Sequence, residues 1–261
     1  MATMSSQHSS KLNQLQRRLP ARLPVTYAWL QEQGYSRSLV KKYVRSGWLA
    51  SPARGVFYRT DPELPLRWMD VIRSLQHLLR YELVIGGFTA LELAGYSHYV
   101  SAGQSTIHVY GPKHPPTWVN RLEIDVVFQY HRQSVPSTLS TEQKVEGTAL
   151  RAATQELAAL QLLEELPKAS WHQVDMVFES LTDMRPSLSH EALTLASVKA
   201  RRLFFWFAER HGHAWVRYLN RERVDLGHGK RQLTPGGHLD PKYLITVPRD
   251  MAPRSGEGFH P

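Results

Sequence analysis

Residues 25–59, VTYAWLQEQGYSRSLVKKYVRSGWLASPARGVFYR, predict a helix, a tight turn, a second helix and a short β-hairpin. Thr26 and Ser36 stand where the two helices need N-caps, because their hydroxyl oxygens can accept from free backbone N–H groups. Gly34 and Gly47 follow the helices and can adopt the left-handed conformation that ends a helix. This order of elements is typical of a winged helix-turn-helix, which sets its second helix in the major groove of DNA.

The second helix is expected to have one buried and one basic face. Its apolar residues recur at helical spacing, and Arg37, Lys41 and Arg45 recur every four residues on the solvent side. Side chains in the first turn reach base edges, whereas cations further along the helix bind phosphates. We therefore predict contacts of Arg37 and Ser38 with bases, of Lys41 with either, and of Lys42, Arg45, Arg54 and Arg59 with phosphates. The alternative is a solvated helix face without a partner.

The hairpin that follows is expected to form from strands at residues 48–50 and 56–59, with residues 51–55 as the tip of the wing. Positive charge gathers around it. The chain has 261 residues and a net charge of +9, and up to Leu64 it contains ten basic and three acidic residues. Most of the excess charge therefore lies in the first quarter of the chain, which favours a polyanionic partner for that part.

The composition limits the other kinds of site. Cysteine is absent, so disulfides and thiolate metal sites are excluded. No apolar run approaches the length of a membrane span, and the N-terminal MATMSSQHSS lacks the apolar core of a signal peptide. We expect a cytoplasmic protein without a membrane partner.

The rest of the chain predicts a larger domain that mixes strands and helices. Strands are expected at residues 83–85, 105–110, 122–130 and 243–247, and helices at residues 66–80, 149–166, 171–181 and 190–211. The predicted fold class is α+β: an N-terminal winged helix-turn-helix domain (residues 1–64), a larger α/β C-terminal domain (residues 65–250) and a flexible tail (residues 251–261). Residues 1–8 are expected to be a second loose tail.

An apolar strand that ends in Gly86-Gly87 before a helix resembles the opening of a nucleotidyltransferase site. Asp125, on a later predicted strand, resembles the third metal-binding acid of that fold. The close acid pair between them is missing, because Glu92 is the only acidic residue between Phe88 and Leu122. The C-terminal domain is therefore predicted either as a degenerate nucleotidyltransferase-like fold without its chemistry, or as a different fold in which the glycine pair is only a tight turn.

A second basic region lies between residues 199 and 231, interleaved with aromatic residues. The aromatic run is expected in the core, and Arg201, Arg202, Lys230 and Arg231 are candidates for a second basic surface, chosen from charge alone. The sequence LGHGKR at residues 226–231 lacks the spacing of a phosphate-binding loop. Four histidines (His211, His213, His228 and His238) show no metal-ligand spacing, so surface or packing roles are predicted for them, with no metal and no cofactor.

Five later segments follow in order: GGFTALELAGY (86–96), LEIDVVF (122–128), ALRAATQELAALQLLEEL (149–166), VKARRLFFWFAERHGHAW (198–215) and LDPKYLITVP (239–248). Together with the basic N-terminal module, they resemble the AbiEi antitoxins of bacterial abortive-infection systems over nearly the whole chain. The resemblance implies a type IV antitoxin that represses its own operon by binding inverted repeats in the promoter. It also implies that the C-terminal domain opposes a nucleotidyltransferase toxin, AbiEii, without a stable complex. The second basic surface is then the candidate antitoxin surface, although no motif assigns its residues. The recognition helix then falls at residues 36–46 and the wing at residues 51–56.

The expected function is therefore that of a non-enzymatic repressor and antitoxin whose partner is double-stranded promoter DNA. Two alternatives belong to other classes: an active nucleotidyltransferase with an appended nucleic-acid-binding domain, and a module that binds only proteins. The missing acid pair opposes the first alternative, and the basic recognition surface opposes the second.

Overall fold

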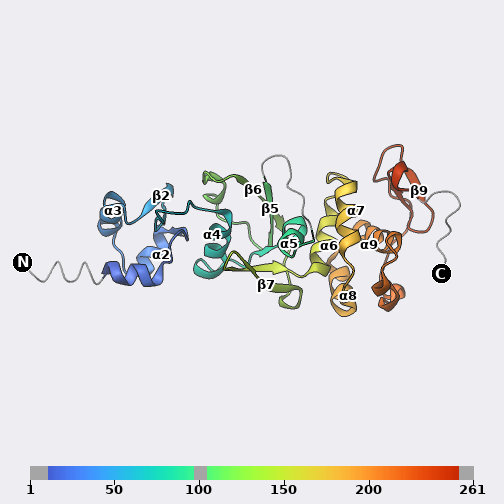
Figure 1. The fold of residues 1–261 in the computed structure, drawn as a ribbon, viewed down its shortest axis with the longest axis horizontal. Helices are drawn as coiled ribbons and strands as arrows, with labels where there is room; N and C mark the ends of the chain where they lie inside the picture. The colour runs from blue at the N-terminus through green and yellow to red at the C-terminus, as the bar shows by residue number, and fades with distance from the viewer. Residues whose placement is uncertain (1–10, 97–104, 253–261) are drawn as a thin grey trace, which may run out of the picture. The chain divides into compact units, whose positions relative to one another are not determined.

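The computed structural model describes residues 11–96 and 105–252 of the chain (Figure 1). The tail predicted at residues 1–8 lies outside the described residues, as does the predicted C-terminal tail from residue 253 onward. The described residues divide into two compact units. Unit 1 contains residues 11–84, 105–134 and 142–151, and unit 2 contains residues 85–96, 135–141 and 152–252. The domain boundary at residue 64 stays a prediction.

The N-terminal part of unit 1 combines short helices with a small sheet. Residues 11–18 are helical, and α2 (Tyr27–Glu32) and α3 (Arg37–Arg45) follow. Strands β1 (Val25–Thr26), β2 (Ala50–Ala53) and β3 (Val56–Tyr58) pair antiparallel in the order β1-β3-β2. The predicted helices and hairpin are confirmed, but the wing is shorter than expected. Ala53 pairs directly with Val56, so only Arg54 and Gly55 form the turn.

The caps and the buried face explain why these helices form. Thr26 Oγ1 accepts from Trp29 N at 3.3 Å, and Ser36 Oγ accepts from Leu39 N at 3.3 Å, as predicted. Gly34 has a φ of 85°, a left-handed value that glycine adopts without strain. The buried residues of α3 belong to one core with those of residues 11–19 and of α2: Leu15, Leu19, Leu30, Leu39, Val40 and Tyr43.

The next elements are a helix and the strands of a mixed sheet. Helix α4 (Trp68–Arg73) continues into the π-helical turn η1 (Ser74–Leu78), which confirms the helix predicted at residues 66–80. Strands β4 (Val84–Ile85), β5 (Ser105–Gly111), β6 (Val126–Arg132), β7 (Ser140–Val145) and β8 (Thr148–Ala153) form a five-stranded sheet in the order β6-β5-β4-β8-β7. Strands β5 and β6 are parallel, in register from Ser105↔Val126 to Gly111↔Arg132.

Two predictions for this region were wrong at their boundaries. Strand β6 begins at Val126 instead of residue 122, after the 3₁₀ turn η2 (Val119–Arg121). The helix predicted at residues 149–166 is a strand, β8, followed by α6 (Gln155–Glu164). The sequence ALRAA favours a helix by intrinsic propensity, but pairing of Ala152 with Ile85 places it in the sheet. Glu146 and Gly147, both with positive φ, make the tight turn from β7 to β8.

Unit 2 is mainly helical. Its helices are α5 (Gly87–Leu93), α6, α7 (Trp171–Ser180), α8 (Pro186–Leu195) and α9 (Val198–Arg210), as Figure 1 shows. The single helix predicted at residues 190–211 is wrong, because the chain breaks between α8 and α9. Ser197 Oγ accepts from Ala200 N at 3.2 Å and so starts a new helix. The aromatic run of α9 is in the core, as predicted: the ring centroid of Phe178 in α7 lies 5.0 Å from that of Phe207 and 6.2 Å from that of Phe204.

The last part of unit 2 is made of short elements: η4 (Ala214–Tyr218), η5 (Arg221–Arg223), β9 (His238–Asp240), β10 (Ile245–Val247) and η6 (Arg249–Met251). The strand predicted at residues 243–247 corresponds to β10, and β9, which sequence patterns did not predict, pairs with it antiparallel. In the part of the chain that the structure describes, no helix has both the length and the apolar character needed to span a membrane.

Candidate nucleic-acid interface

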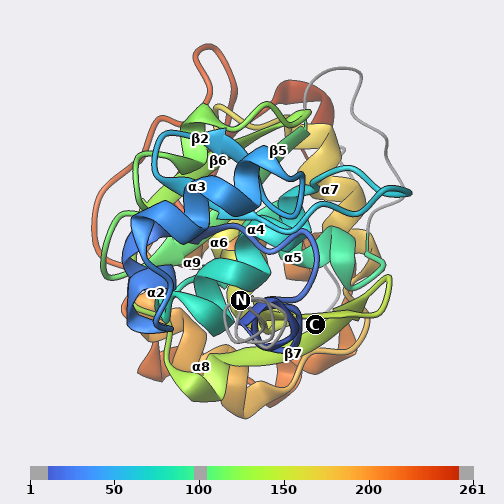
Figure 2. The same ribbon diagram turned by 90° about the vertical axis from the view of Figure 1, so that its left-hand side faces the viewer.

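Helix α3 presents five of the predicted DNA contacts on its exposed surface. Figure 2 shows α3 with β2 of the hairpin next to it. The side chains of Arg37, Ser38, Lys41, Lys42 and Arg45 are all exposed, and Arg54 is exposed at the turn of the hairpin. The opposite face of α3 is buried, so the orientation of the helix is fixed by its core contacts. The structure therefore brings six of the seven predicted residues to the surface of one small module.

The first turn of α3 is ordered by contacts that sequence patterns did not predict. The Arg37 guanidinium lies over the ring of Tyr27, with 5.2 Å between its central carbon and the ring centroid. Tyr27 is the first residue of α2, and its backbone N–H donates to Gly55 O at 2.9 Å. Ser38 Oγ lies 3.0 Å from Ser36 Oγ, the capping hydroxyl. The side chains of Arg37 and Ser38, which are predicted to contact bases, are therefore held in defined positions by other residues of the module.

Among the described residues, no acidic side chain neutralises the positive charge of this surface. The first turn of α3 contains no acidic residue, and its last turn contains Lys42 and Arg45. Within residues 11–96 and 105–252, no carboxylate lies within ion-pair distance of the basic residues of α3 or of Arg54. Cations that are not paired with a carboxylate are available to release counterions from a phosphate backbone. The surface has the charge that a polyanion requires.

Arg59 differs from the other six residues. It is half-buried, and its Nη1 donates to Gln16 O at 3.1 Å and to Leu19 O at 2.9 Å. These carbonyls lie at the end of the helix at residues 11–18, so the Arg59 side chain connects the hairpin to that helix. We therefore leave Arg59 out of the interface proposed below.

The helix at residues 11–18 also supports the turn before α3. Lys11 Nζ donates to Gly34 O at 3.4 Å, and Arg18 Nη1 donates to Gln33 Oε1 at 2.9 Å. Tyr35 OH donates to Lys11 O at 3.1 Å, and burial raises the pKa of this phenol. No local sequence signal could have revealed these contacts, because each joins residues at least 15 positions apart.

The glycine pair at the start of α5 has a packing role. Gly87 has a φ of 53°, and its N–H donates to Gln161 Oε1 of α6 at 3.0 Å. That amide is therefore committed to a side chain of the protein. Asp125 is exposed and precedes β6 instead of lying within it. The nucleotidyltransferase-like fold stays a prediction.

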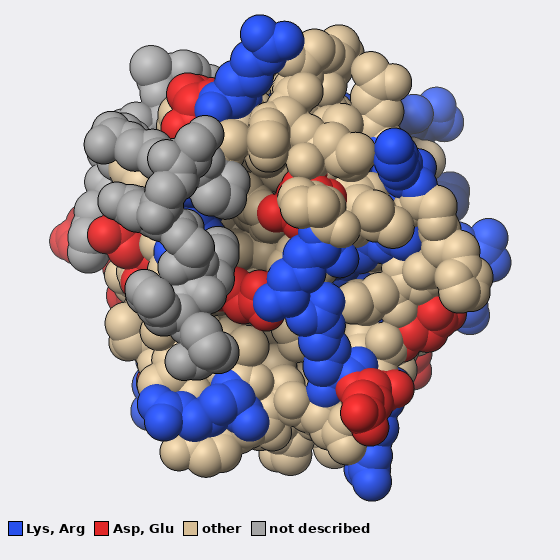
Figure 3. Space-filling model, turned by 90° about the vertical axis from the view of Figure 1, so that its right-hand side faces the viewer, with Lys and Arg blue, Asp and Glu red and all other residues tan. Residues whose placement is uncertain are grey.

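The second basic surface predicted in unit 2 needs correction. Arg202 is only 2% exposed and cannot belong to a surface, because its guanidinium donates to Leu226 O, Gly229 O and Leu244 O. Burial lowers the pKa of Arg202. Arg201 is half-buried and also bonded to backbone carbonyls, whereas Lys230 and Arg231 are exposed. Figure 3 shows that basic side chains do gather in a band on the face seen from the right of Figure 1.

Two of the four histidines help α7 to pack on α9, the kind of role that was predicted for them. His211 Nε2 lies 2.8 Å from Asp175 Oδ1, which also accepts from Arg210 Nε at 2.9 Å. Burial by itself raises the pKa of Asp175, but hydrogen bonds from His211 and Arg210 outweigh it and lower the pKa. His213 Nε2 lies 2.6 Å from Phe178 O, and burial lowers the pKa of this imidazole.

Comparison with known proteins covers almost the whole chain. Residues 8–102 match the N-terminal domain of AbiEi antitoxin transcriptional regulators. Residues 104–248 match the AbiEi antitoxin transcriptional regulators of type IV toxin–antitoxin systems. No curated protein matches the chain.

Among solved structures, the chain is similar to the crystal structure of the RV2827C protein from Mycobacterium tuberculosis. The two share 19% sequence identity with a TM-score of 0.59, over 91% of this chain and 89% of that chain. This likeness supports a shared α+β fold, with a small N-terminal region of helices and strands and a larger part built on a mixed sheet.

Proposed function

The chain belongs to the AbiEi antitoxin family of type IV toxin–antitoxin transcriptional regulators, and on this premise we propose that its N-terminal module binds promoter DNA as a winged helix-turn-helix. Helix α3 is the recognition helix, and the turn between β2 and β3 is the tip of the wing. The observation that carries the proposal is the exposed, unopposed basic surface of α3 with its capped first turn.

The residues of this module divide between two kinds of contact. Arg37 and Ser38, in the first turn, read base edges, since the N-terminal residues of a recognition helix enter the groove. Lys41, Lys42 and Arg45 further along α3, and Arg54 at the wing, bind phosphates. Two copies occupy the halves of an inverted repeat, because a palindromic site requires two identical modules. By this means the protein represses its own operon.

The C-terminal part of the chain opposes a nucleotidyltransferase toxin of the AbiEii type, without a stable complex and without catalysis of its own. Family membership supports this assignment. The commitment of the Gly87 amide to Gln161, together with the missing acid pair, supports the absence of nucleotidyl transfer.

The DNA assignment is tested with the full-length protein and the DNA upstream of its own gene. The double variant Lys41→Ala/Arg45→Ala should abolish most of the affinity measured by fluorescence anisotropy. Removing two phosphate contacts should also make the negative slope of log affinity against log salt concentration less steep, by about 1.8 for each protomer. The matched control is Lys113→Ala/Lys168→Ala, which removes the same charge at exposed positions outside the module. Equal affinity of both double variants would refute α3 as the recognition helix.

The antitoxin assignment is tested by co-expression with the toxin. The protein should restore growth of cells that express the nucleotidyltransferase encoded beside it, and Lys41→Ala/Arg45→Ala should restore growth equally when its gene is driven by an unrelated promoter. Co-purification of both proteins as a stable complex would contradict the proposed mode of action.

A further inference from the structure

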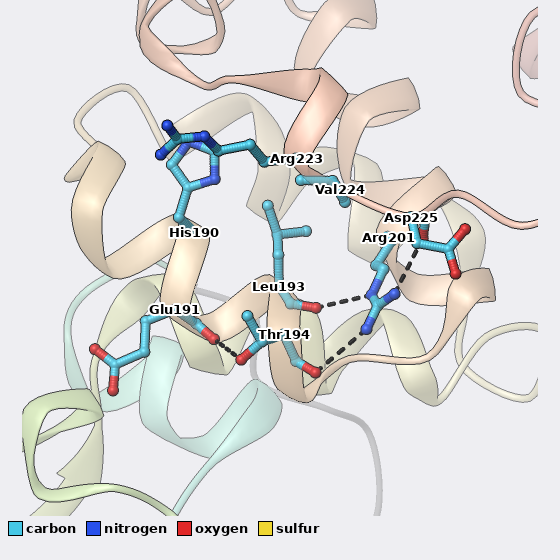
Figure 4. A pocket seen from close by; sticks show the side chains of 8 residues that line it. All are labelled: His190, Glu191, Leu193, Thr194, Arg201, Arg223, Val224 and Asp225. Atoms are coloured by element: carbon cyan, nitrogen blue, oxygen red, sulfur yellow. Dashed lines mark hydrogen bonds between the residues drawn. The ribbon is translucent and has the colours of Figure 1, made fainter.

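A cavity of about 450 Å³ opens in unit 2 between α8, the start of α9 and the segment after η5 (Figure 4). The cavity is lined by His190, Glu191, Leu193, Thr194, Arg201, Arg223, Val224 and Asp225. Its size is in the range of sites for small molecules. Neither the family match nor the DNA-binding proposal assigns a role to it.

The wall of this cavity is held in place by two successive arginines. Arg201 donates to Leu193 O at 2.8 Å, to Asp225 O at 3.0 Å and to Thr194 O at 3.2 Å, as Figure 4 shows. Arg202 donates to Leu226 O at 2.6 Å and to Gly229 O at 2.7 Å. The segment at residues 225–229 is therefore fastened to α9 by both side chains. A cavity with a fixed wall is preformed, which lowers the free-energy cost of binding a ligand.

Two arginines and two acidic residues line the cavity, but neither arginine is paired with a carboxylate. Arg201 donates to neutral backbone carbonyls, and no carboxylate of residues 11–96 and 105–252 lies within ion-pair distance of Arg201 or Arg223. The two acids of the lining have other partners. Glu191 accepts from the Thr138 hydroxyl, and Asp225 Oδ1 accepts from Gly227 N at 2.8 Å. In Figure 4 both carboxylates point away from Leu193.

The remaining lining supplies a donor and an apolar floor. His190 Nε2 accepts from Asn220 N at 2.9 Å, so the proton of the neutral imidazole is on Nδ1. Leu193 and Val224 are buried and cover the floor with apolar surface. Arg223 also lines the cavity, and its exposed side chain has no hydrogen bond or ion pair within the described part of the chain.

We propose that this cavity binds a small organic anion, a phosphate or carboxylate group on a compact apolar or flat body. Arg223 binds the anion directly through its planar fork of donors. Arg201 contributes a fixed positive charge, and His190 Nδ1 contributes a hydrogen bond. The body of the ligand rests on Leu193 and Val224. The inference is independent of DNA binding, because every residue that it uses lies in unit 2.

The test uses the full-length protein and three probes that share one aromatic ring: phenyl phosphate, benzoate and uncharged benzyl alcohol. Binding is measured by ligand-detected NMR titration at constant chloride concentration. We expect one or both anions to bind and benzyl alcohol to bind at least about tenfold more weakly, because charge-assisted hydrogen bonds supply most of the affinity. Phenyl phosphate alone would identify a phosphate ligand, benzoate alone a carboxylate ligand, and both together a general anion site.

The variant Arg223→Gln should weaken anion binding by about tenfold or more, since it removes a charge-assisted contact. Arg217→Gln is the matched control, because Arg217 is exposed in the same unit but does not line the cavity. Both substitutions are at the surface, and thermal unfolding of both variants at the wild-type midpoint would establish that they fold. Absence of binding by both anions, equal binding of benzyl alcohol, or an equal loss in Arg217→Gln would overturn the proposal.

Discussion

The guanidinium of Arg37 stacks on the ring of Tyr27, and the Tyr27 backbone N–H donates to Gly55 O. One residue therefore joins the turn of the hairpin to the first turn of α3. A cation–π contact at an exposed site contributes only about 0.5–1 kcal/mol, but it restricts the directions in which a long side chain can point. If α3 is the recognition helix, as proposed, we expect this contact to affect selectivity for bases more than stability.

The variant Tyr27→Ala should relax the base preference at one position of each half-site, because Arg37 loses the ring that orients it. Tyr27→Phe keeps the ring and should keep the preference. The measurement is selection of binding sites from a random DNA library by the wild type and by each variant. An unchanged motif for Tyr27→Ala would refute the positioning role, whereas failure of the wild type to select any motif would refute DNA binding itself.

The variant Ser36→Ala should destabilise the N-terminal module by about 1 kcal/mol, because Leu39 N loses its capping acceptor. Ser36→Thr retains a hydroxyl and should remain close to the wild type. Urea-induced unfolding followed by Trp fluorescence measures the difference. If both variants have the wild-type free energy of unfolding, the cap does not contribute to stability.

The variant Arg202→Met should destabilise the protein by about 1–3 kcal/mol, because it removes the guanidinium that donates to Leu226 O and Gly229 O. Arg231→Met changes the same charge at an exposed position and should have little effect. The midpoint of thermal unfolding compares the two. Equal midpoints would show that the hydrogen bonds of Arg202 do not stabilise the fold.

The hydrogen-bonded pair of Asp175 and His211 should make the free energy of unfolding fall at acid pH. The pKa of Asp175 is lowered in the folded protein, so its contribution is fully present above the ordinary aspartate pKa of about 3.9 and is lost as the pH falls through the lowered value. Asp175→Asn should remove this loss, and Asp183→Asn, at an exposed position, should retain it. The free energy of unfolding at neutral and acid pH is the measurement. A wild-type pH dependence in Asp175→Asn would contradict the assignment.

Local signals in the sequence predicted the N-terminal module well. Ser36 lies at the start of an amphipathic pattern with glycines on either side, so its cap, its buried face and its basic face are all recorded within a dozen residues. The contact of Tyr27 with Arg37 was not predictable in the same way, because it depends on how two helices cross.

The errors lie where distant residues decide the conformation. The alanines of β8 favour a helix by themselves, and only pairing with β4 makes them a strand. The break before α9 did leave a local trace, since Ser197 is a capping residue in an otherwise helical pattern. Arg202 left none, because a sequence gives no indication that carbonyls some 24 to 42 positions later will surround an arginine.

The two hydrogen bonds of Arg59 to Gln16 O and Leu19 O define how the protein can be divided. A truncated chain that begins at Val25 would contain every proposed DNA contact, yet Arg59 would have no acceptors there. The core of the module would also lose Leu15 and Leu19, both fully buried. A fragment designed to keep all these contacts must therefore begin at or before Lys11, because Tyr35 also donates to the Lys11 carbonyl.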